Sequence, residues 1–432
     1  MKPEELLQSL IRFNTSNPPG HEKECIDFIA QLLESHGIES TILAKDPQRP
    51  NLLARLKGKS DASPLLLYGH VDVVPAQEED WTYPPFSGEI ADGFVWGRGA
   101  LDMKGAVAMM VSALIAAKTK NLELPSDVIL CLVSDEEEFG EFGASFLVEE
   151  HPEYFENVRY AISEFGGFTL YVGGKKFYPI EVAQKQKCAI KATVKGKTGH
   201  GSSLVKGGAM ARLGKLLQTL DTRQCPVRVT PAVQMMFSAM ADALPFPSNL
   251  IMRQLLNPKR TDFILNLLGT KGEVFVPMFH NTVNATVVNG GHKINVIPGE
   301  VEVTMDARLL PGSTDQDVLA ELRHMLGEEG IELQSVLYDA GPAEPDMGLY
   351  DTLAQILKEA DPDGIPIPLL LTASSDARFF SKLGIQTYGF IPMQLPEDMN
   401  FSRTIHSANE RIPIESLKFG TDALLGAIKR YR

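Results

Sequence analysis

The most regular feature of the chain is a series of short apolar runs, each followed at once by polar or charged residues. The three clearest runs are 65–68 before His70, 128–133 before the acidic run at 135–138, and 160–162 before Glu164. Runs of this length without alternation are typical of strands that are buried on both faces. Because ligands bind at the carboxyl ends of strands in open α/β sheets, the residues after these runs are candidates for a functional site.

Segments with helical periodicity lie between these runs and are separated by loops rich in Pro, Gly and Asn. The predicted helices are 3–13, 22–36, 106–118, 209–220 and one at the C-terminus, and the further predicted strands are 38–43, 51–56 and 366–371. This alternation of strands and helices predicts an α/β fold.

The pattern of apolar and polar residues changes near Cys188. Residues 189–194 alternate between apolar and polar, as in a half-exposed strand, and residues 196–202 form a predicted flexible loop. A region rich in Met and Pro follows, and then strand-like segments at 281–288, 293–300 and 301–308. We therefore expect an inserted α+β domain at 188–308 within a first domain that comprises 1–187 and 309–432.

Composition narrows the class of protein. A chain of 432 residues favours two domains, and 44% hydrophobic with 22% charged residues is typical of a soluble globular protein. The net charge of −14 argues against a nucleic-acid partner, although local arginines can still bind an anionic substrate.

The cysteines and the N-terminus indicate a compartment. Cys25, Cys131, Cys188 and Cys225 are scattered without metal-site or disulfide spacing, which suits a reducing environment. The N-terminus has no signal-peptide core, and no segment approaches the roughly 20 apolar residues that span a bilayer. We expect a cytoplasmic protein without a membrane partner.

The polar residues at the strand ends combine into a chemically specific set. They are His70, Asp102, Glu136, Glu137 and Glu164, together with His406 from the far end of the chain. Two histidines and three carboxylates suit two zinc-like ions that share a bridging aspartate, and one carboxylate is left over as a general base. Such a site suits amide hydrolysis.

Each member of this set also has a purely structural interpretation. His70 could be a core histidine satisfied by the neighbouring carboxylate of Asp72. Asp102 could be the N-cap of the helix that follows it. The acidic run at 135–138 could be a solvated face, although its position after a buried strand then leaves the repulsion among the acids unexplained.

Three ordered motifs connect these residues to a known family. Residues 69–75 (GHVDVVP), residues 97–105 (GRGALDMKG) and residues 135–137 (DEE) resemble successive signatures of the M20 metallopeptidases. This family includes aminoacylase, carboxypeptidase S-like enzymes, acetylornithine deacetylase and glutamate carboxypeptidase. The resemblance covers essentially the whole chain and favours the aminoacylase and carboxypeptidase S-like branch.

The resemblance implies a mixed-sheet di-zinc peptidase domain with helices on both faces, and an inserted α+β lid that also forms a homodimer. It implies roles for seven residues: His70 and Glu164 on one zinc, Glu137 and His406 on the other, Asp102 as the bridge, Glu136 as the base and Asp72 as the residue that orients His70. It also implies a cis peptide bond just after Asp102, and Co2+ or Mn2+ as substitutes for Zn2+. The acidic run leaves an alternative in which the base and the ligand are Glu137 and Glu138.

The resemblance implies further residues around the substrate. His200 is similar to a lid histidine that stabilises the oxyanion across a dimer interface. Asn295 and Arg308 resemble substrate-facing lid residues, although Asp306 and Arg308 could be only a cross-strand pair. Arg378 suits recognition of a substrate carboxylate, or an ion pair with Asp376.

These observations predict a hydrolase that cleaves an amide bond next to a free carboxylate in an N-acyl amino acid or a short peptide. One alternative is a dipeptidase that requires a free amine, with the acidic loop at 78–80 as a candidate for recognising it. The other is a non-catalytic relative that keeps the fold as a binding module, which the complete set of ligands disfavours.

Overall fold

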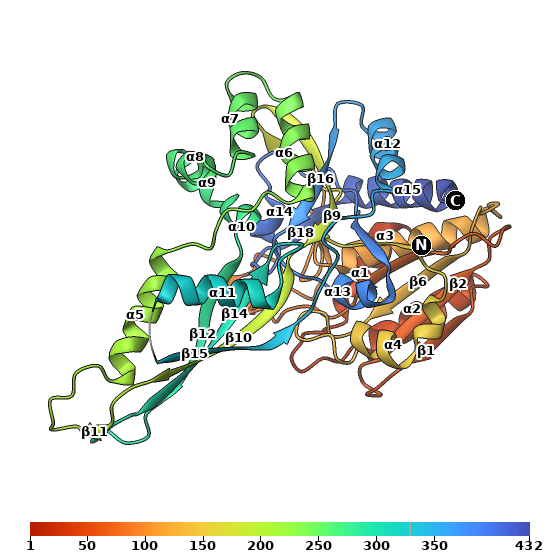
Figure 1. Cartoon of the computed structure of the whole chain (residues 1–432). Coiled ribbons are helices and arrows are strands. Elements are labelled where there is room, and N and C mark those ends of the chain that lie inside the picture. The colour runs from red at the N-terminus through yellow and green to blue at the C-terminus, as the bar shows by residue number, and fades with distance from the viewer. Residues whose placement is uncertain (328–329) are drawn as a thin grey trace.

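A nine-stranded mixed sheet forms the centre of the larger of two lobes in a computed structural model that describes residues 1–327 and 330–432 (Figure 1). Its strands, in spatial order, are β1 (Ser40–Leu43), β2 (Asn51–Leu56), β6 (Val128–Val133), β3 (Leu65–His70), β7 (Tyr160–Ser163), β17 (Gln386–Gly389), β9 (Lys175–Gln184) and β16 (Ile365–Leu371), with β8 (Leu170–Val172) beside β9. The α/β class and the mixed sheet are confirmed.

Strand β3 lies between two parallel neighbours. Leu65 is in register with Val128 of β6 and with Tyr160 of β7. Parallel strands in register end at the same edge of a sheet, so the residues that follow β3, β6 and β7 meet there.

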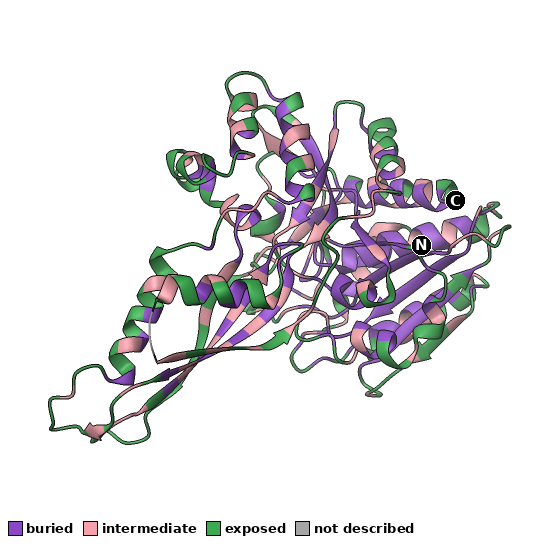
Figure 2. Ribbon diagram, viewed as in Figure 1, coloured by how far each residue is buried: buried purple, intermediate pink, exposed green. Residues whose placement is uncertain are grey.

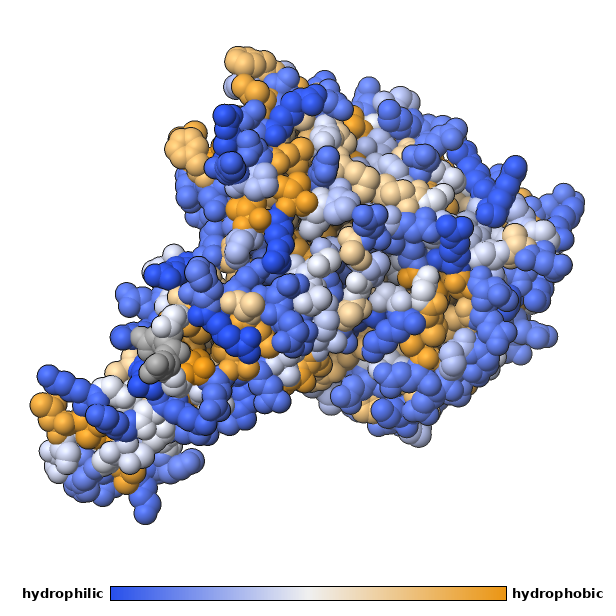
Figure 3. All heavy atoms as spheres, in the orientation of Figure 1, coloured by the Kyte–Doolittle hydropathy of each residue, from blue (hydrophilic) through white to orange (hydrophobic). Residues whose placement is uncertain are grey.

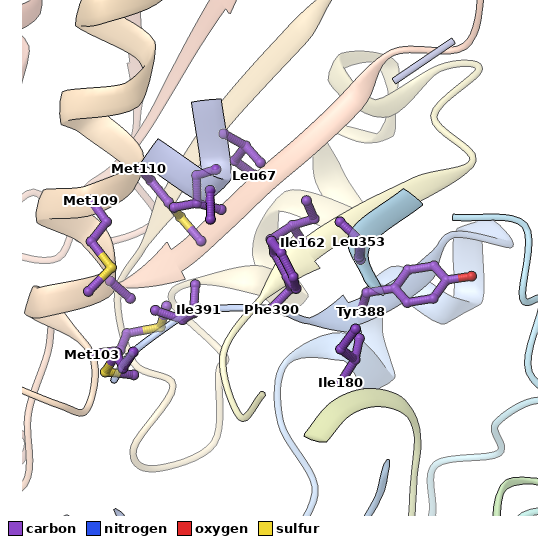
Figure 4. Close-up of a cluster of buried hydrophobic side chains, with 14 of the residues drawn as sticks. Leu67, Met103, Met109, Met110, Ile162, Ile180, Leu353, Tyr388, Phe390 and Ile391 are labelled. Carbon is purple, nitrogen blue, oxygen red and sulfur yellow. The ribbon is translucent and has the colours of Figure 1, made fainter. Parts of the chain in front are cut away.

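Helices cover both faces of this sheet because the side chains of its strands alternate. Leu65 and Leu67 join one core and Leu66 and Tyr68 the other. The first core is covered by α1 (Pro3–Arg12), α2 (Lys23–Ser35), α3 (Lys104–Thr119), α12 (Tyr350–Ala360) and α15 (Ile414–Arg430); the second by α4 (Ala144–Glu150) and α13 (Ala377–Phe380). Figure 2 shows the strands buried between these layers, and Figure 4 shows Leu67, Met110 and Ile162 within the first core.

Short elements complete the larger lobe around the strand ends. They are η1 (Glu78–Asp80), η2 (Pro152–Phe155), η3 (Ser381–Leu383), α14 (Phe401–Thr404) and a three-stranded sheet of β18 (Arg411–Pro413), β5 (Phe94–Trp96) and β4 (Glu89–Ala91).

A four-stranded antiparallel sheet forms the smaller lobe (Figure 1). Its order is β12 (Thr282–Gly290), β14 (Glu300–Leu309), β10 (Gln186–Lys195) and β15 (Ile331–Tyr338), and α5 (Ala209–Thr222) and α11 (Asp315–Leu326) pack on one face. Two short strands, β11 (Gly199–His200) and β13 (Val296–Ile297), pair at its far tip, so the predicted loop at 196–202 contains a strand and the predicted strand at 293–300 is mostly irregular.

The smaller lobe includes residues that lie beyond the predicted insertion at 188–308. Strand β15 lies after residue 308 but pairs with β10, because its alternating exposure suits the open edge of that sheet. The Met- and Pro-rich region forms α6 (Pro231–Ala243), α7 (Ser248–Leu255), α8 (Thr261–Leu268), α9 (Thr270–Glu273) and α10 (Val276–Phe279). Val233, Phe237 and Phe279 of this region join the core of the larger lobe. We therefore propose that the inserted lobe continues to about residue 339.

Within the described ranges, no helix has both the length and the apolar character that a bilayer span requires. All four cysteines are buried free thiols. The cytoplasmic location stays a prediction. Figure 3 shows a mostly hydrophilic surface with apolar side chains gathered on the helical region and at the tip of the smaller lobe.

Lys185 stabilises the connection between β9 and β10. It is fully buried, and its ammonium group donates to the carbonyls of Pro277 and His280 and to the hydroxyl of Thr282, at 2.9–3.1 Å. A single side chain thus joins the end of the helical region to the point where the chain passes between the two sheets.

Replacing Lys185 by Met should lower the free energy of unfolding by roughly 1–3 kcal/mol, because three buried acceptors lose their donor. The matched control is Lys191→Met on β10, where a partly exposed pair with Glu302 should contribute less than about 1 kcal/mol. Urea denaturation measures both; equal effects would contradict the role of Lys185.

The burial of Lys185 also predicts that the stability of the folded chain depends on pH. Burial lowers the pKa of Lys185 to about 7 from 10.5, so the unfolded chain binds more protons than the folded chain between these values. Stability should therefore rise with pH over this window, and Lys185→Met should lack that rise. Urea denaturation at pH 7 and pH 9 should show a larger gap between wild type and variant at pH 9.

Candidate metal centre

His70 is the last residue of β3 and faces carboxylates from three other segments. Its Nε2 lies 3.1 Å from Oδ1 of Asp102, 3.4 Å from Oε2 of Glu164 and 4.0 Å from Oε2 of Glu136. Glu164 follows β7 and Glu136 follows β6, which are the two parallel neighbours of β3. The sheet edge therefore brings together the groups that the apolar runs indicated.

Asp102 connects this half of the site to a second histidine. Nε2 of His406 lies 3.2 Å from Oδ2 of Asp102 and 3.2 Å from Oε2 of Glu137. Each oxygen of the Asp102 carboxylate thus faces a different histidine. His406 is about half exposed whereas Asp102 is buried, so the site opens to solvent on the His406 side.

The charges of the site are strongly coupled. Burial acts to lower the pKa of His70, but the hydrogen bonds to Asp102, Asp72 and Glu164 outweigh it and raise the pKa well above its ordinary value. Hydrogen bonds to Asp102 and Glu137 raise the pKa of His406 to about 10. Burial and the repulsion among neighbouring carboxylates raise the pKa of Glu164 to about 7. An excess of buried negative charge therefore demands positive charge at this position.

The donor set fits metal ions. The candidate ligand atoms of His70, Glu136 and Glu164 lie within 4.8 Å of one another, and so do those of His70, Asp102 and Glu137. Among the described residues, Oε1 of Glu137 is buried without a hydrogen-bond partner. Imidazole nitrogens with carboxylate oxygens are a ligand set that zinc accepts.

The surroundings of Asp102 exclude its structural interpretation. The N-cap of α3 is Met103, and no side chain caps the helix. The carboxylate of Asp102 faces the two histidines instead. The peptide bond between Asp102 and Met103 is cis, as the resemblance implied.

Asp72 contacts both His70 and the acidic loop. Nδ1 of His70 lies 2.9 Å from the backbone carbonyl oxygen of Asp72 and 3.5 Å from its carboxylate. The carboxylate accepts hydrogen bonds from the backbone N–H groups of Glu136 and Glu137, at 3.2 and 3.1 Å. Asp72 therefore orients His70 mainly through its main chain and fixes the acidic loop through its side chain.

Within the acidic run, the geometry favours Glu136 and Glu137 as the functional pair. Both side chains face the histidines, and the side chain of Glu137 is only 5% exposed. Glu138 is exposed and makes none of these contacts.

Glu410 is a supporting residue that the sequence analysis missed. Its carboxylate is fully buried and accepts hydrogen bonds from the backbone N–H groups of Gly99, Leu101 and Asp102, at 2.8–3.2 Å. Arg98 lies 2.6 Å from the same carboxylate. In the sequence, Glu410 follows His406 by four residues and Arg98 precedes Asp102 by four. The opposite charges of Glu410 and Arg98, each close to a predicted metal ligand, were the signal that could have identified this pair.

The predicted lid residues lie away from this centre or face other partners. His200 and Asn295 are exposed at the tip of the smaller lobe, where the N–H of Gly201 donates to the carbonyl of Asn295. Nε of Arg308 lies 3.1 Å from Asp306, two residues away on the same strand.

Arg378 is also engaged within the chain. It is 8% exposed, donates to the carbonyl of Phe139 at 2.9 Å and lies 3.6 Å from Asp339. The predicted ion pair with Asp376 is wrong, since both oxygens of Asp376 lack a hydrogen-bond partner among the described residues. Arg378 lines a cavity of about 50 Å³ together with Glu181 and Gln184.

Glu410→Gln should weaken zinc binding by about 10–100-fold, because the amide removes the charge that holds the Asp102 loop and leaves Arg98 buried without its partner. Competition with a chromogenic chelator measures the affinity. Glu415→Gln, at an exposed position of α15, is the control and should leave affinity unchanged. Wild-type affinity in Glu410→Gln would show that the loop keeps its place without this carboxylate.

The model of peptidase family M20/M25/M40 matches residues 66–430. The human N-fatty-acyl-amino acid synthase/hydrolase PM20D1 is 29% identical over 368 residues, which cover 82% of this chain and 71% of the relative. Its Xenopus tropicalis counterpart is 30% identical over 368 residues, covering 82% and 70%. A Dictyostelium discoideum protein named "Probable carboxypeptidase S-like 2" is 26% identical over 395 residues, covering 88% and 74%.

Solved structures show the same fold. An M20 family metallo-carboxypeptidase from Sulfolobus solfataricus has a TM-score of 0.70 at 18% identity, over 100% of this chain and 99% of that one. A dinuclear metal-binding M20 peptidase from Bacillus subtilis has a TM-score of 0.62 at 13% identity, over 99% and 96%. With the family match over most of its length, the chain is a metallopeptidase of the M20/M25/M40 family.

Proposed function

We propose that the protein hydrolyses an amide bond next to a free carboxylate, in N-acyl amino acids or short peptides, with two zinc ions. The observation that carries the proposal is the convergence of His70, Asp102, Glu137, Glu164 and His406 with a fourth carboxyl group, that of Glu136. The names of the relatives support the substrate class, because an N-fatty-acyl-amino acid contains such an amide and a carboxypeptidase acts at a carboxyl end.

Five residues would hold the metal pair. His70 and Glu164 would bind one ion, His406 and Glu137 the other, and the two oxygens of Asp102 would reach both. Bound zinc ions lower the pKa of a water molecule and polarise the substrate carbonyl. Co2+ and Mn2+ accept the same ligands and are proposed substitutes.

Glu136 would act as the general base. Burial and the charge of Glu164 raise the pKa of its carboxyl well above the ordinary value, so its affinity for a proton is greater than that of a free glutamate. Glu136 accepts a proton from the attacking water while the new C–O bond forms. It then donates that proton to the amide nitrogen as the C–N bond breaks, which releases the amine and the acid.

The substrate carboxylate would be recognised by arginine. Arg378 and Arg308 are the candidates, with Asn295 as a polar lid contact. Nε of Arg378 is buried and makes no hydrogen bond among the described residues, although it lies 3.6 Å from the carboxylate of Asp339.

His200 would act across a homodimer. Within one chain it lies at the tip of the smaller lobe, far from the strand ends (Figure 1). Leu204, Ile294 and Val296 are exposed at this tip, and one edge of β12 has no partner strand in the part of the chain that the structure describes. Exposed apolar groups beside an open strand edge favour association with a second copy, whose His200 could then reach this site and stabilise the oxyanion.

A dipeptidase is the second candidate function. The exposed acids Glu78, Glu79 and Asp80 on η1 could recognise a free amine. The human carnosine dipeptidase 1 has the same fold, with a TM-score of 0.65 at 18% identity over 99% of this chain and 95% of that one.

Glu136→Gln should lower kcat by about 10²–10⁴-fold while two zinc ions per chain remain bound, because the amide cannot accept the proton. Steady-state kinetics and elemental analysis measure the two quantities. Glu138→Gln is the neighbouring control and should keep wild-type kcat. Wild-type kcat in Glu136→Gln, with loss of kcat in Glu138→Gln, would instead assign the base and the ligand to Glu137 and Glu138.

A substrate panel separates the two candidate functions. N-acyl amino acids should release their amine, and amidation of the substrate carboxylate should raise KM or abolish turnover because the arginine loses its partner. Amine release only from unblocked dipeptides would favour the dipeptidase instead.

Mixing two inactive variants tests His200. His200→Ala and Glu136→Gln should each be nearly inactive alone, whereas mixed dimers contain one site with both native residues. Random pairing then restores about a quarter of wild-type activity. No recovery after exchange of subunits, with dimers confirmed by sedimentation, would rule out action across the interface.

A further inference from the structure

A network of buried polar side chains supports the acidic loop at residues 135–138. Its first member is the carboxylate of Asp72, which accepts from the N–H groups of Glu136 and Glu137. The side-chain amide of Asn17 also donates to this carboxylate, at 2.9 Å. Asn17 is 3% exposed, and no part of the proposed mechanism uses it.

Asn17 connects Asp72 to a second buried acid, Asp135. The same amide nitrogen lies 3.0 Å from Oδ1 of Asp135. An amide NH2 group has two hydrogens, so it can donate to two carboxylates without adding charge. An acid at position 17 would instead place three carboxylates together.

Asp135 holds the start of the loop in an unfavourable backbone conformation. Its φ is 70°, in the left-handed region that most residues avoid. Its carbonyl accepts from the N–H of Gly140 at 2.7 Å, and its carboxylate accepts from the N–H of Phe142 at 3.3 Å. Asp135 therefore closes the loop whose next residue is Glu136.

Arg49 completes the chain of contacts. Its Nη1 donates to Asp135 at 2.9 Å, and its Nη2 donates to Glu22 at 2.7 Å. The guanidinium also lies 4.9 Å from the ring centre of Phe142. The side chain is 8% exposed, so these contacts are screened little by solvent.

We infer that Arg49 and Asn17 are positioning residues for Glu136. Arg49 sets the place of Asp135, Asn17 couples Asp135 to Asp72, and Asp72 fixes the backbone of the base and its neighbour. This inference rests on the proposed function, in which Glu136 is the base. The flat guanidinium is required because two of its nitrogens reach two carboxylates while its face contacts Phe142, which the single ammonium group of lysine cannot do.

The test compares Arg49→Met and Arg49→Lys with a matched control, Arg55→Met. Arg55 lies on β2 and pairs with Asp127 near the surface, outside the site. With saturating zinc and confirmed metal content, both Arg49 variants should lose about tenfold or more in kcat, with KM changed less than about threefold. Asn17→Ala should act in the same direction, and the control should match wild type.

Amide hydrogen exchange supplies a second readout that does not depend on turnover. Peptides that cover residues 135–143 should exchange faster in the Arg49 variants, because the N–H groups of Glu136, Glu137 and Phe142 lose their fixed acceptors. The same peptides should exchange at the wild-type rate in Arg55→Met. A loss of kcat without faster exchange in this loop would also overturn the inference.

The two proposals fail in different ways. Wild-type turnover in Glu136→Gln would overturn the proposed base, whatever Arg49 does. Loss of turnover in Glu136→Gln, with wild-type kcat and exchange in Arg49→Lys, would overturn the positioning role alone. Arg49→Lys keeps the positive charge beside Glu22, so it remains informative where Arg49→Met fails to fold.

Discussion

Repulsion among buried carboxylates is the constraint on which the rest of this structure depends. Asp72, Asp102, Glu136, Glu137 and Glu164 meet at one edge of the sheet, and most of their surface is removed from water. Such a cluster is stable only where positive charge and hydrogen-bond donors compensate it. The histidines and the proposed metal ions supply positive charge, Asn17 donates to Asp72, and Arg49 is paired with the neighbouring acid Asp135.

The order of the strands brings the repelling carboxylates to the same edge of the sheet as His70. Because β3 runs parallel to both β6 and β7, His70, Glu136 and Glu164 end on the same edge without any long loop. The two residues that complete the site, Asp102 and His406, come from loops that Glu410 joins through hydrogen bonds to the Asp102 loop. The strands thus place His70, Glu136 and Glu164, and the buried carboxylate of Glu410 fixes the loop of Asp102.

The sequence located the side chains that meet at the strand ends better than the residues that support them. Apolar runs before His70 and Glu164 mark strand ends directly, whereas His406 could be assigned only by resemblance, since nothing local distinguishes it. Asn17, Arg49 and Glu410 were missed because their partners lie 27 to 312 residues away, and such pairs leave no periodic signal. The helices α6–α10 were missed because their Pro and Met content hides a pattern that only packing against the larger core reveals.

The central claim is that this edge of the sheet holds two metal ions. Anomalous diffraction from crystals of the zinc-loaded protein, recorded on both sides of the zinc edge, tests it most directly. The account predicts two peaks, one beside His70 and Glu164 and the other beside His406 and Glu137, with Asp102 between them. A single peak, or zinc bound at other residues, would contradict it.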